Sequence, residues 1–135
     1  MQKSKTLTHN NLSNNDISKM LEVSPLIICG TLNRMLESGV IIDASISSTE
    51  LGIIQTANGP KKPSWFIDLE QNKSKTLVIN NIDKIDEYEQ QKFVEILKYK
   101  TISSVSLPQK TKIVVLCNNL NKVSSTILSL CQTII

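Results

Sequence analysis

The residues with the clearest capacity for chemistry lie at the end of one apolar segment. Residues 76–79 (Thr-Leu-Val-Ile) run directly into Asn80 and Asn81, and Asp83 follows two positions later. Two consecutive acidic side chains at such a position would hold Mg²⁺ and polarise a water molecule. An Asn side chain accepts hydrogen bonds but carries no charge, so it is a poor ligand for a hard cation and cannot act as a general base. The end of this segment therefore offers polar side chains without the charges that a hard cation needs.

A zinc site is not expected. The three cysteines, Cys29, Cys117 and Cys131, are widely spaced, no CxxC pair occurs, and His9 is the only histidine. Structural zinc normally needs four Cys or His ligands arranged in close pairs. Each cysteine lies in or beside an apolar run, and free cysteine is among the most buried residue types. We expect three reduced, buried thiols, and no metal or other cofactor.

Five apolar segments that alternate with helical patterns must position these residues. The segments are continuous rather than alternating, which is typical of strands buried on both faces of a parallel sheet. Strands that alternate with helices favour an α/β layered fold. The predicted strands are residues 25–29, 40–42, 76–79, 112–117 and 131–135, and the predicted helices are residues 15–22, 31–38, 86–100 and 121–130.

Residues 43–71 lack these patterns. This segment contains Asn58-Gly59-Pro60 and Pro63, which are turn-forming residues. It is predicted to form a loop or hairpin. We expect Trp65 and Phe66 to anchor it by packing on the core, because base-stacking sites usually show several exposed aromatic side chains.

Length and composition indicate a single folded domain that covers residues 1–135. The chain is 40% hydrophobic and 20% charged, which is an ordinary balance for a globular protein. A net charge of +3 is compatible with nucleic acid nearby but too small to predict it. No apolar run approaches the roughly 20 residues that cross a bilayer. We therefore expect a cytoplasmic protein with no membrane partner.

From residue 76 to the C-terminus the chain resembles the AAA+ branch of the P-loop ATPases, and the clamp-loader subunits of DNA replication most closely. Asn80, Asn81 and Asp83 stand where the family has its Walker B motif, which normally begins with two acids. Residues 90–97 resemble the helix that follows this motif. Asn119, after the strand at 112–117, stands at the sensor-1 position, which in the family lies between the γ-phosphate and the attacking water.

The resemblance continues through Ser129-Leu130-Cys131, which stands where clamp loaders carry a Ser-Arg-Cys motif. The arginine of that motif reaches into the ATP site of the neighbouring subunit and stabilises transferred charge. The neutral side chain of Leu130 cannot do this. The resemblance implies that Thr126, Ser129, Leu130 and Cys131 belong to a subunit interface, with Leu130 in an apolar contact.

In the first half of the chain, residues 25–30 resemble the first strand of the family and residues 40–45 the second. A phosphate-binding loop of the form GxxxxGK[ST] should lie between them, but only Gly30 and Thr31 remain and there is no lysine. The phosphate loop, the Walker B acids and the arginine finger are thus all missing. The resemblance implies a reduced AAA+-like parallel sheet flanked by helices.

Such a domain would be a pseudo-ATPase rather than an enzyme. Its expected function is protein–protein assembly with other AAA+-like or clamp-loader-type subunits in DNA replication.

Residues 12–42 also fit a winged helix-turn-helix. In that alternative, residues 25–36 form a recognition helix, and the chain is an N-terminal winged helix plus an α/β half-domain with a boundary near residue 72. It would be a DNA-binding regulator with a C-terminal interaction region. Arg34, Lys61 and Lys62 would then contact nucleic acid.

The two hypotheses differ in what residues 25–29 form. On a recognition helix, Leu26, Ile27 and Cys29 would face outward, and an apolar surface of this kind would bind DNA badly. The half-domain would also leave sheet edges exposed. A strand at residues 25–29 favours the AAA+-like hypothesis, whereas a helix there favours the winged helix.

Overall fold

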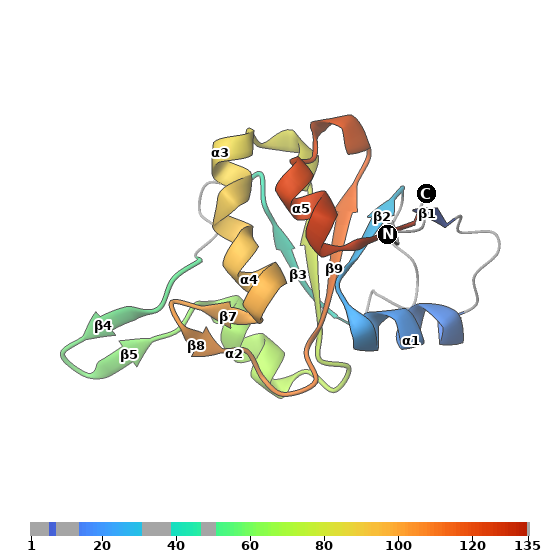
Figure 1. Ribbon diagram of the computed structural model, residues 1–135. Coiled ribbons are helices and arrows are strands. Elements are labelled where there is room, and N and C mark those ends of the chain that lie inside the picture. Colours follow the sequence, from blue (N-terminus) through green and yellow to red (C-terminus); the bar gives the residue numbers. More distant parts are fainter. Residues whose placement is uncertain (1–5, 8–13, 31–38, 47–50, 135) are drawn as a thin grey trace.

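The computed structural model, which describes residues 6–7, 14–30, 39–46 and 51–134, is built around one sheet of six parallel strands (Figure 1). Five of these strands coincide with the five apolar segments, which confirms the prediction of an α/β fold with a parallel sheet. In spatial order they are β1 (Thr6–Leu7), β10 (Gln132–Ile134), β2 (Leu26–Cys29), β9 (Lys112–Cys117), β6 (Thr76–Asn80) and β3 (Val40–Asp43).

Helices cover both faces of the sheet, because successive strand side chains point to opposite faces. Helix α1 (Asn14–Val23) covers one face and packs Ile17 and Leu21 against Leu26 and Ile28 of β2. Ile27, which lies between these two strand residues, belongs to the larger core on the other face. The continuous apolar pattern of β2 therefore follows from burial on both sides.

The larger core lies under the helices that follow β6 and β9. The predicted helix at 86–100 is divided into three successive pieces, and the predicted helix at 121–130 is interrupted at Val123 and Ser124. Ser124 has extended backbone, and its hydroxyl accepts a 3.3 Å hydrogen bond from the N–H of Ile127, so a new helix starts there. The elements are η3 (Ile82–Lys84), α3 (Glu87–Gln90), η4 (Gln91–Phe93), α4 (Val94–Tyr99), η5 (Leu120–Lys122) and α5 (Ser125–Leu130).

Residues 51–71 form a hairpin followed by a helix. The hairpin pairs β4 (Ile54–Thr56) with β5 (Gly59–Lys61) and projects from the body of the molecule (Figure 1). The sequence did not predict helix α2 (Ser64–Gln71), which begins directly after Pro63. Trp65 and Phe66 are buried in this helix, which confirms that they anchor the segment by packing. A second small hairpin pairs β7 (Thr101–Ile102) with β8 (Val105–Ser106).

The winged-helix alternative was wrong about residues 25–29. Residues Leu26–Cys29 form strand β2, between β10 and β9, rather than a helix. The physical reason is burial, because Leu26 and Ile27 are completely buried in the sheet and would be exposed on a recognition helix. The sheet also joins strands from both sides of residue 72, since β3 pairs with β6 and β2 pairs with β9. The helix predicted at 31–38 lies outside the described residues.

Candidate functional site

Polar residues gather at the carboxyl edge of the sheet, where parallel strands end together. Asp43 of β3 is in register with Asn80 of β6, and Cys29 of β2 is in register with Cys117 of β9. The chain leaves β2 toward β3 on one side, and it leaves β9 toward β10 on the other side. In open α/β sheets, ligands bind outside the carboxyl ends of strands where the connections diverge in this way. This edge is therefore the first place to look for a site.

Asn80 and Asn81 are engaged in bonds with near neighbours. The side-chain oxygen of Asn80 accepts a 2.9 Å hydrogen bond from the N–H of Asn81. Asn81 has left-handed backbone (φ 63°), which Asn tolerates better than most residues. Hydrogen bonds from the side chains of Ser45 and Asn81 hold the pKa of Asp43 below its usual value, so this carboxylate stays ionised. The side chains of Asn80 and Asn81 thus support the turn and the neighbouring strand end.

Asp83 is the acid of this motif that the sequence retains, and it ties two strand ends together. It is buried, and its Oδ2 accepts hydrogen bonds from the backbone N–H groups of Asn118 at 3.0 Å and Asn119 at 2.9 Å. Its Oδ1 is buried and has no hydrogen-bond partner within the part of the chain that the structure describes. Carboxylate bonds to backbone N–H groups are charge-assisted and strong. Asp83 therefore holds the loop after β9 against the loop after β6.

Asn119 caps a helical turn. Its Oδ1 accepts a 3.0 Å hydrogen bond from the N–H of Asn121 at the start of η5. The prediction of a sensor-1-like position thus falls on a residue that lies at the expected strand end but has a local structural partner.

None of the three cysteines forms a disulfide bond. Cys29 and Cys117 end their strands at this edge, whereas Cys131 directly precedes β10, at the opposite edge of the sheet. The Sγ of Cys29 lies 3.5 Å from the carbonyl oxygen of Asn118. Burial, helped by the neighbouring Cys29, raises the pKa of Cys117 to about 12, and burial raises the pKa of Cys131 to about 12. Both thiols are therefore protonated at neutral pH and are poor nucleophiles. Among the described residues, no three His, Cys, Asp or Glu side chains are arranged to hold a metal ion.

The predicted interface residues fall into two groups. Thr126 and Ser129 are exposed on α5, and the hydroxyl of Ser129 donates a 2.7 Å bond to the carbonyl of Thr126. Leu130 is half-buried and packs against the core, and Cys131 is buried. Cys131 is enclosed by the core of its own chain, and its place in an interface stays a prediction. The surface that a partner could reach on α5 is the one around Thr126 and Ser129.

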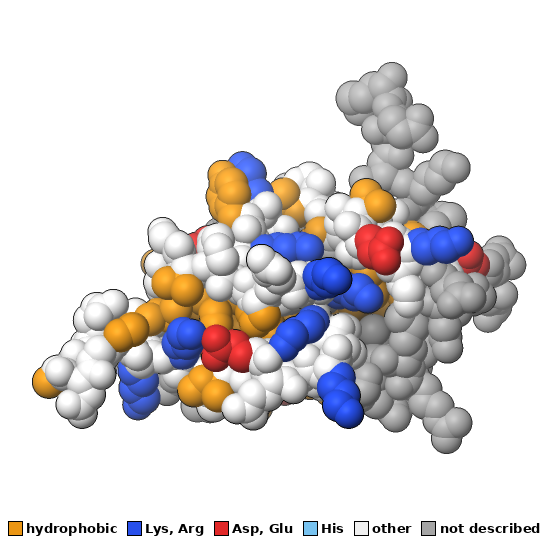
Figure 2. Space-filling model, turned by 90° about the horizontal axis from the view of Figure 1, so that it is seen from below, with side chains coloured by type: hydrophobic (Ala, Val, Ile, Leu, Met, Phe, Trp, Pro, Cys, Tyr) orange, Lys and Arg blue, Asp and Glu red, His pale blue; other side chains and the backbone are white. Residues whose placement is uncertain are grey.

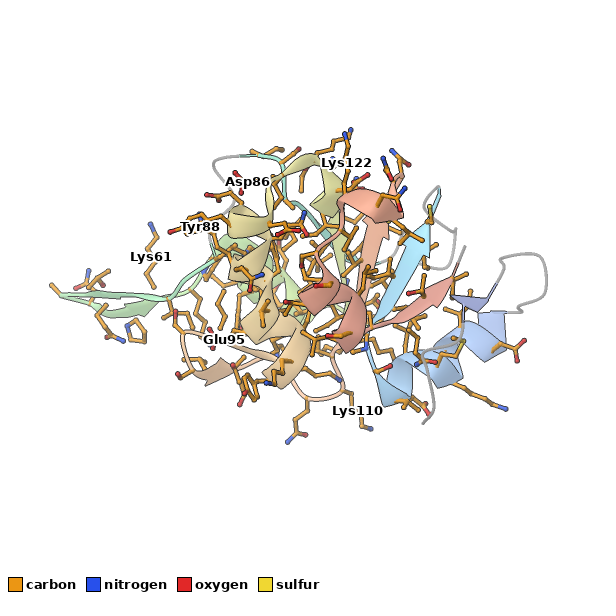
Figure 3. The ribbon with its side chains drawn as sticks, turned by 45° about the horizontal axis from the view of Figure 1, so that its top comes forward. Lys61, Asp86, Tyr88, Glu95, Lys110 and Lys122 are labelled. Carbon is orange, nitrogen blue, oxygen red and sulfur yellow. The ribbon has the colours of Figure 1, made fainter. Side chains whose placement is uncertain are left out.

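Two of the three predicted nucleic-acid contacts, Lys61 and Lys62, lie next to each other. Lys61 is exposed on the projecting hairpin (Figure 3). Lys62 is held against α2, where its Nζ lies 3.0 Å from Glu70 and 5.0 Å from the centre of the Phe66 ring. Arg34 lies outside the described residues. Lys61 and Lys62 both line one hollow of about 580 Å³ beside the hairpin, but the ammonium group of Lys62 is paired with Glu70.

Gln90 is a structural centre that sequence reasoning missed. It is completely buried at the end of α3. Its Nε2 donates to the carbonyls of Ile85 (3.0 Å) and Lys122 (2.8 Å), and its Oε1 accepts from the N–H of Ser124 (2.7 Å). The carboxamide therefore joins the helix after the Walker B position to the start of α5. A buried amide in an otherwise polar stretch of sequence carries no local signal.

A second group that the sequence did not reveal is a set of lysines at the opposite, amino edge of the sheet. Lys73 and Lys75 precede β6, Lys100 and Lys110 precede β9, and Lys112 is the first residue of β9. Because the two strands were predicted to be parallel, the sequence could have placed these lysines at one edge of the sheet.

Comparisons with known proteins do not assign a family. No model of a known protein family matches the sequence, and no curated protein is significantly similar to it. Within the described residues, none of the helices has both the length and the apolar character needed to cross a membrane. The function must therefore be inferred from the geometry of this chain.

Proposed function

We propose that this chain is a non-hydrolysing AAA+-like subunit of the clamp-loader type, which acts in DNA replication by assembling with other AAA+-like subunits. The observation that carries the proposal is how polar groups at the carboxyl edge of the sheet are hydrogen-bonded within the chain. Asp83 binds the backbone of the loop after β9, Asn119 caps η5, and Asn81 bonds Asp43. The groups that would meet a nucleotide and its metal are engaged in holding the fold together, so catalysis is not their role.

The sheet supports the AAA+-like part of the proposal. In AAA+ sheets the strand before the phosphate loop lies between the strand that leads to sensor 1 and the strand that follows the arginine-finger segment. Here β2 lies between β9, which leads to Asn119, and β10, which follows Leu130. Fold alone does not define function, so this arrangement supports the family resemblance and not an activity.

The surface of α5 supports the assembly part. The segment that corresponds to the trans-acting motif is held rigidly at both ends, by the Ser124 cap with its bond to Gln90 and by the packing of Leu130. Thr126 and Ser129 are exposed between these fixed points. A rigid exposed helix binds a partner with little loss of conformational entropy. We also propose a cytoplasmic location, which is compatible with three cysteines that form no disulfide bond.

The proposal is tested by capture of partners. Thr126→Arg with Ser129→Arg places two charges on the exposed face of α5, and Gln55→Arg with Ser106→Arg places the same charge on exposed positions of the two hairpins. We expect the tagged unaltered chain and the hairpin variant to capture AAA+ ATPase subunits from extracts of the cells that make the protein. The α5 variant should capture at least about tenfold less of these subunits, because charges that are buried without partners at an interface cost several kcal/mol of binding free energy.

Circular dichroism would establish that both variants are folded. The proposal fails if AAA+ subunits are absent from the captured proteins, or if the three chains capture them equally.

A further inference from the structure

A cleft lined by five lysines lies at the amino edge of the sheet, on the opposite side of the molecule from the candidate site. It has a volume of about 460 Å³ and lies between the turns that precede β6 and β9 and the end of α4. Figure 2 shows this edge face on, with blue lysine side chains across its middle. The five lysines are Lys73, Lys75, Lys100, Lys110 and Lys112.

The positive charge of the cleft is almost uncompensated. Glu22 is the one acidic residue among the described residues that line it. The ion pairs found among the described residues are Lys62 with Glu70 and Lys92 with Glu89, so none involves a cleft lysine. Low-dielectric walls around charges of one sign focus the electric field and concentrate counter-ions. The cleft therefore attracts anions.

Local stability does not explain why these residues are lysines. Lys75, Lys100 and Lys110 have left-handed backbone, with φ of 51°, 53° and 66°. Gly or Asn adopts this conformation more readily than a residue with a long side chain. At three positions around one cleft, the chain thus carries a charged residue where backbone energy favours an uncharged one.

Compensation of helix ends explains part of the cluster but not all of it. The Nζ of Lys75 donates to the carbonyl of Leu69 at 3.1 Å and to that of Glu70, which completes the end of α2. Lys100 caps α4, where a cation is also favourable. Lys110 lies in the turn before β9 and Lys112 is the first residue of β9, and both are away from any helix end within the described residues. Their charge has no such structural use.

We propose that this cleft binds the phosphate backbone of a double-stranded nucleic acid, without reading its sequence. The charge of the lysines complements a row of phosphates, and an ammonium group binds phosphate as a compact point charge. The described lining contains no arginine for bidentate contact with base edges and no aromatic ring for stacking on unpaired bases. The site is distinct from the α5 surface, so it does not depend on the proposed assembly.

The test is fluorescence anisotropy with a labelled DNA duplex of arbitrary sequence, at several salt concentrations. The full chain should bind, and log K should fall with log[salt] with a slope of about −4 if four lysines each contact a phosphate. Lys100→Gly with Lys110→Gly should raise Kd about tenfold and reduce this slope by about 2. Lys100→Arg with Lys110→Arg keeps the charge and should keep the affinity.

A matched control removes two charges from the other end of the molecule. Lys84→Gln with Lys122→Gln changes net charge equally, and Figure 3 shows Lys122 and Lys110 at opposite ends. We expect this control to bind within about twofold of the unaltered chain, because it removes no contacting charge. The glycine variant relieves two strained positions and should remain folded. If thermal unfolding shows that the glycine variant is not folded, the variant Lys73→Gln with Lys110→Gln is used in its place.

Four results would overturn the proposal. The first is that the duplex does not bind at low salt, and the second is that the control variant loses as much affinity for the duplex as the glycine variant does. The third is that polyglutamate binds more tightly than the duplex. The fourth is that tripolyphosphate binds and the duplex does not. The third result would assign the cleft to an acidic protein, and the fourth to a small polyanion.

Discussion

At the scale of single residues, Asp83 illustrates how one buried carboxylate joins two loops of the sheet edge. Its Oδ2 accepts hydrogen bonds from two backbone N–H groups of the loop after β9, so the carboxylate stabilises the junction of two strand ends. The sequence predicts where Asp83 lies, because it follows a strand end. It does not predict the partners, because these come from a distant segment and have no side-chain signature.

Replacing Asp83 by Ala should destabilise the fold by about 3 kcal/mol, because two N–H groups lose a charged acceptor in a buried place. Asp83→Asn keeps an acceptor oxygen and should cost about 1–2 kcal/mol. The measurement is urea-induced unfolding of each variant. Lys84→Ala, at the exposed neighbouring position, should stay within about 0.5 kcal/mol of the unaltered chain. An Asp83→Ala variant as stable as this control would show that the two bonds do not stabilise the fold.

At the scale of secondary-structure elements, predictions succeeded where apolar residues form a continuous run and failed where tertiary contacts decide. Five of the six strands of the sheet were predicted from such runs. Helix α2 was missed because it is short and follows Pro63 in a turn-rich segment, and its stability comes from burial of Trp65 and Phe66. The predicted helix at 121–130 is interrupted because Ser124 starts a new helix with its own side chain.

Gln90 should determine how α5 is held, and a matched pair of variants tests this. Gln90→Leu fills the same space but leaves the Ser124 N–H and two carbonyls without their partner. The expected loss is about 3 kcal/mol in the free energy of unfolding, measured with urea. Gln91→Leu, at the exposed next position, should change stability by about 0.5 kcal/mol or less. Equal unfolding midpoints for the two variants would contradict the assigned role of Gln90.

At the scale of the whole molecule, the two ends of the sheet have different characters. At the carboxyl edge the polar groups are bonded to one another, and at the amino edge lysines line an open cleft. Sequence reasoning found the first edge because its residues end predicted strands. It missed the second because the cleft exists only when β6 and β9 are neighbours, which brings the lysine-bearing turns before them together. Strand order is a property of the fold that local patterns do not encode.

The central claim is that this chain has the form of an ATPase without the activity. Its most direct test is release of phosphate from Mg²⁺-ATP by the full chain, compared with a blank that lacks protein. We predict equal rates, because the chain has amides where the Walker B acids should be and no lysine in a phosphate loop. Turnover above the blank that Asn80→Ala or Asn81→Ala abolishes would contradict the claim and place a working catalytic site at the carboxyl edge.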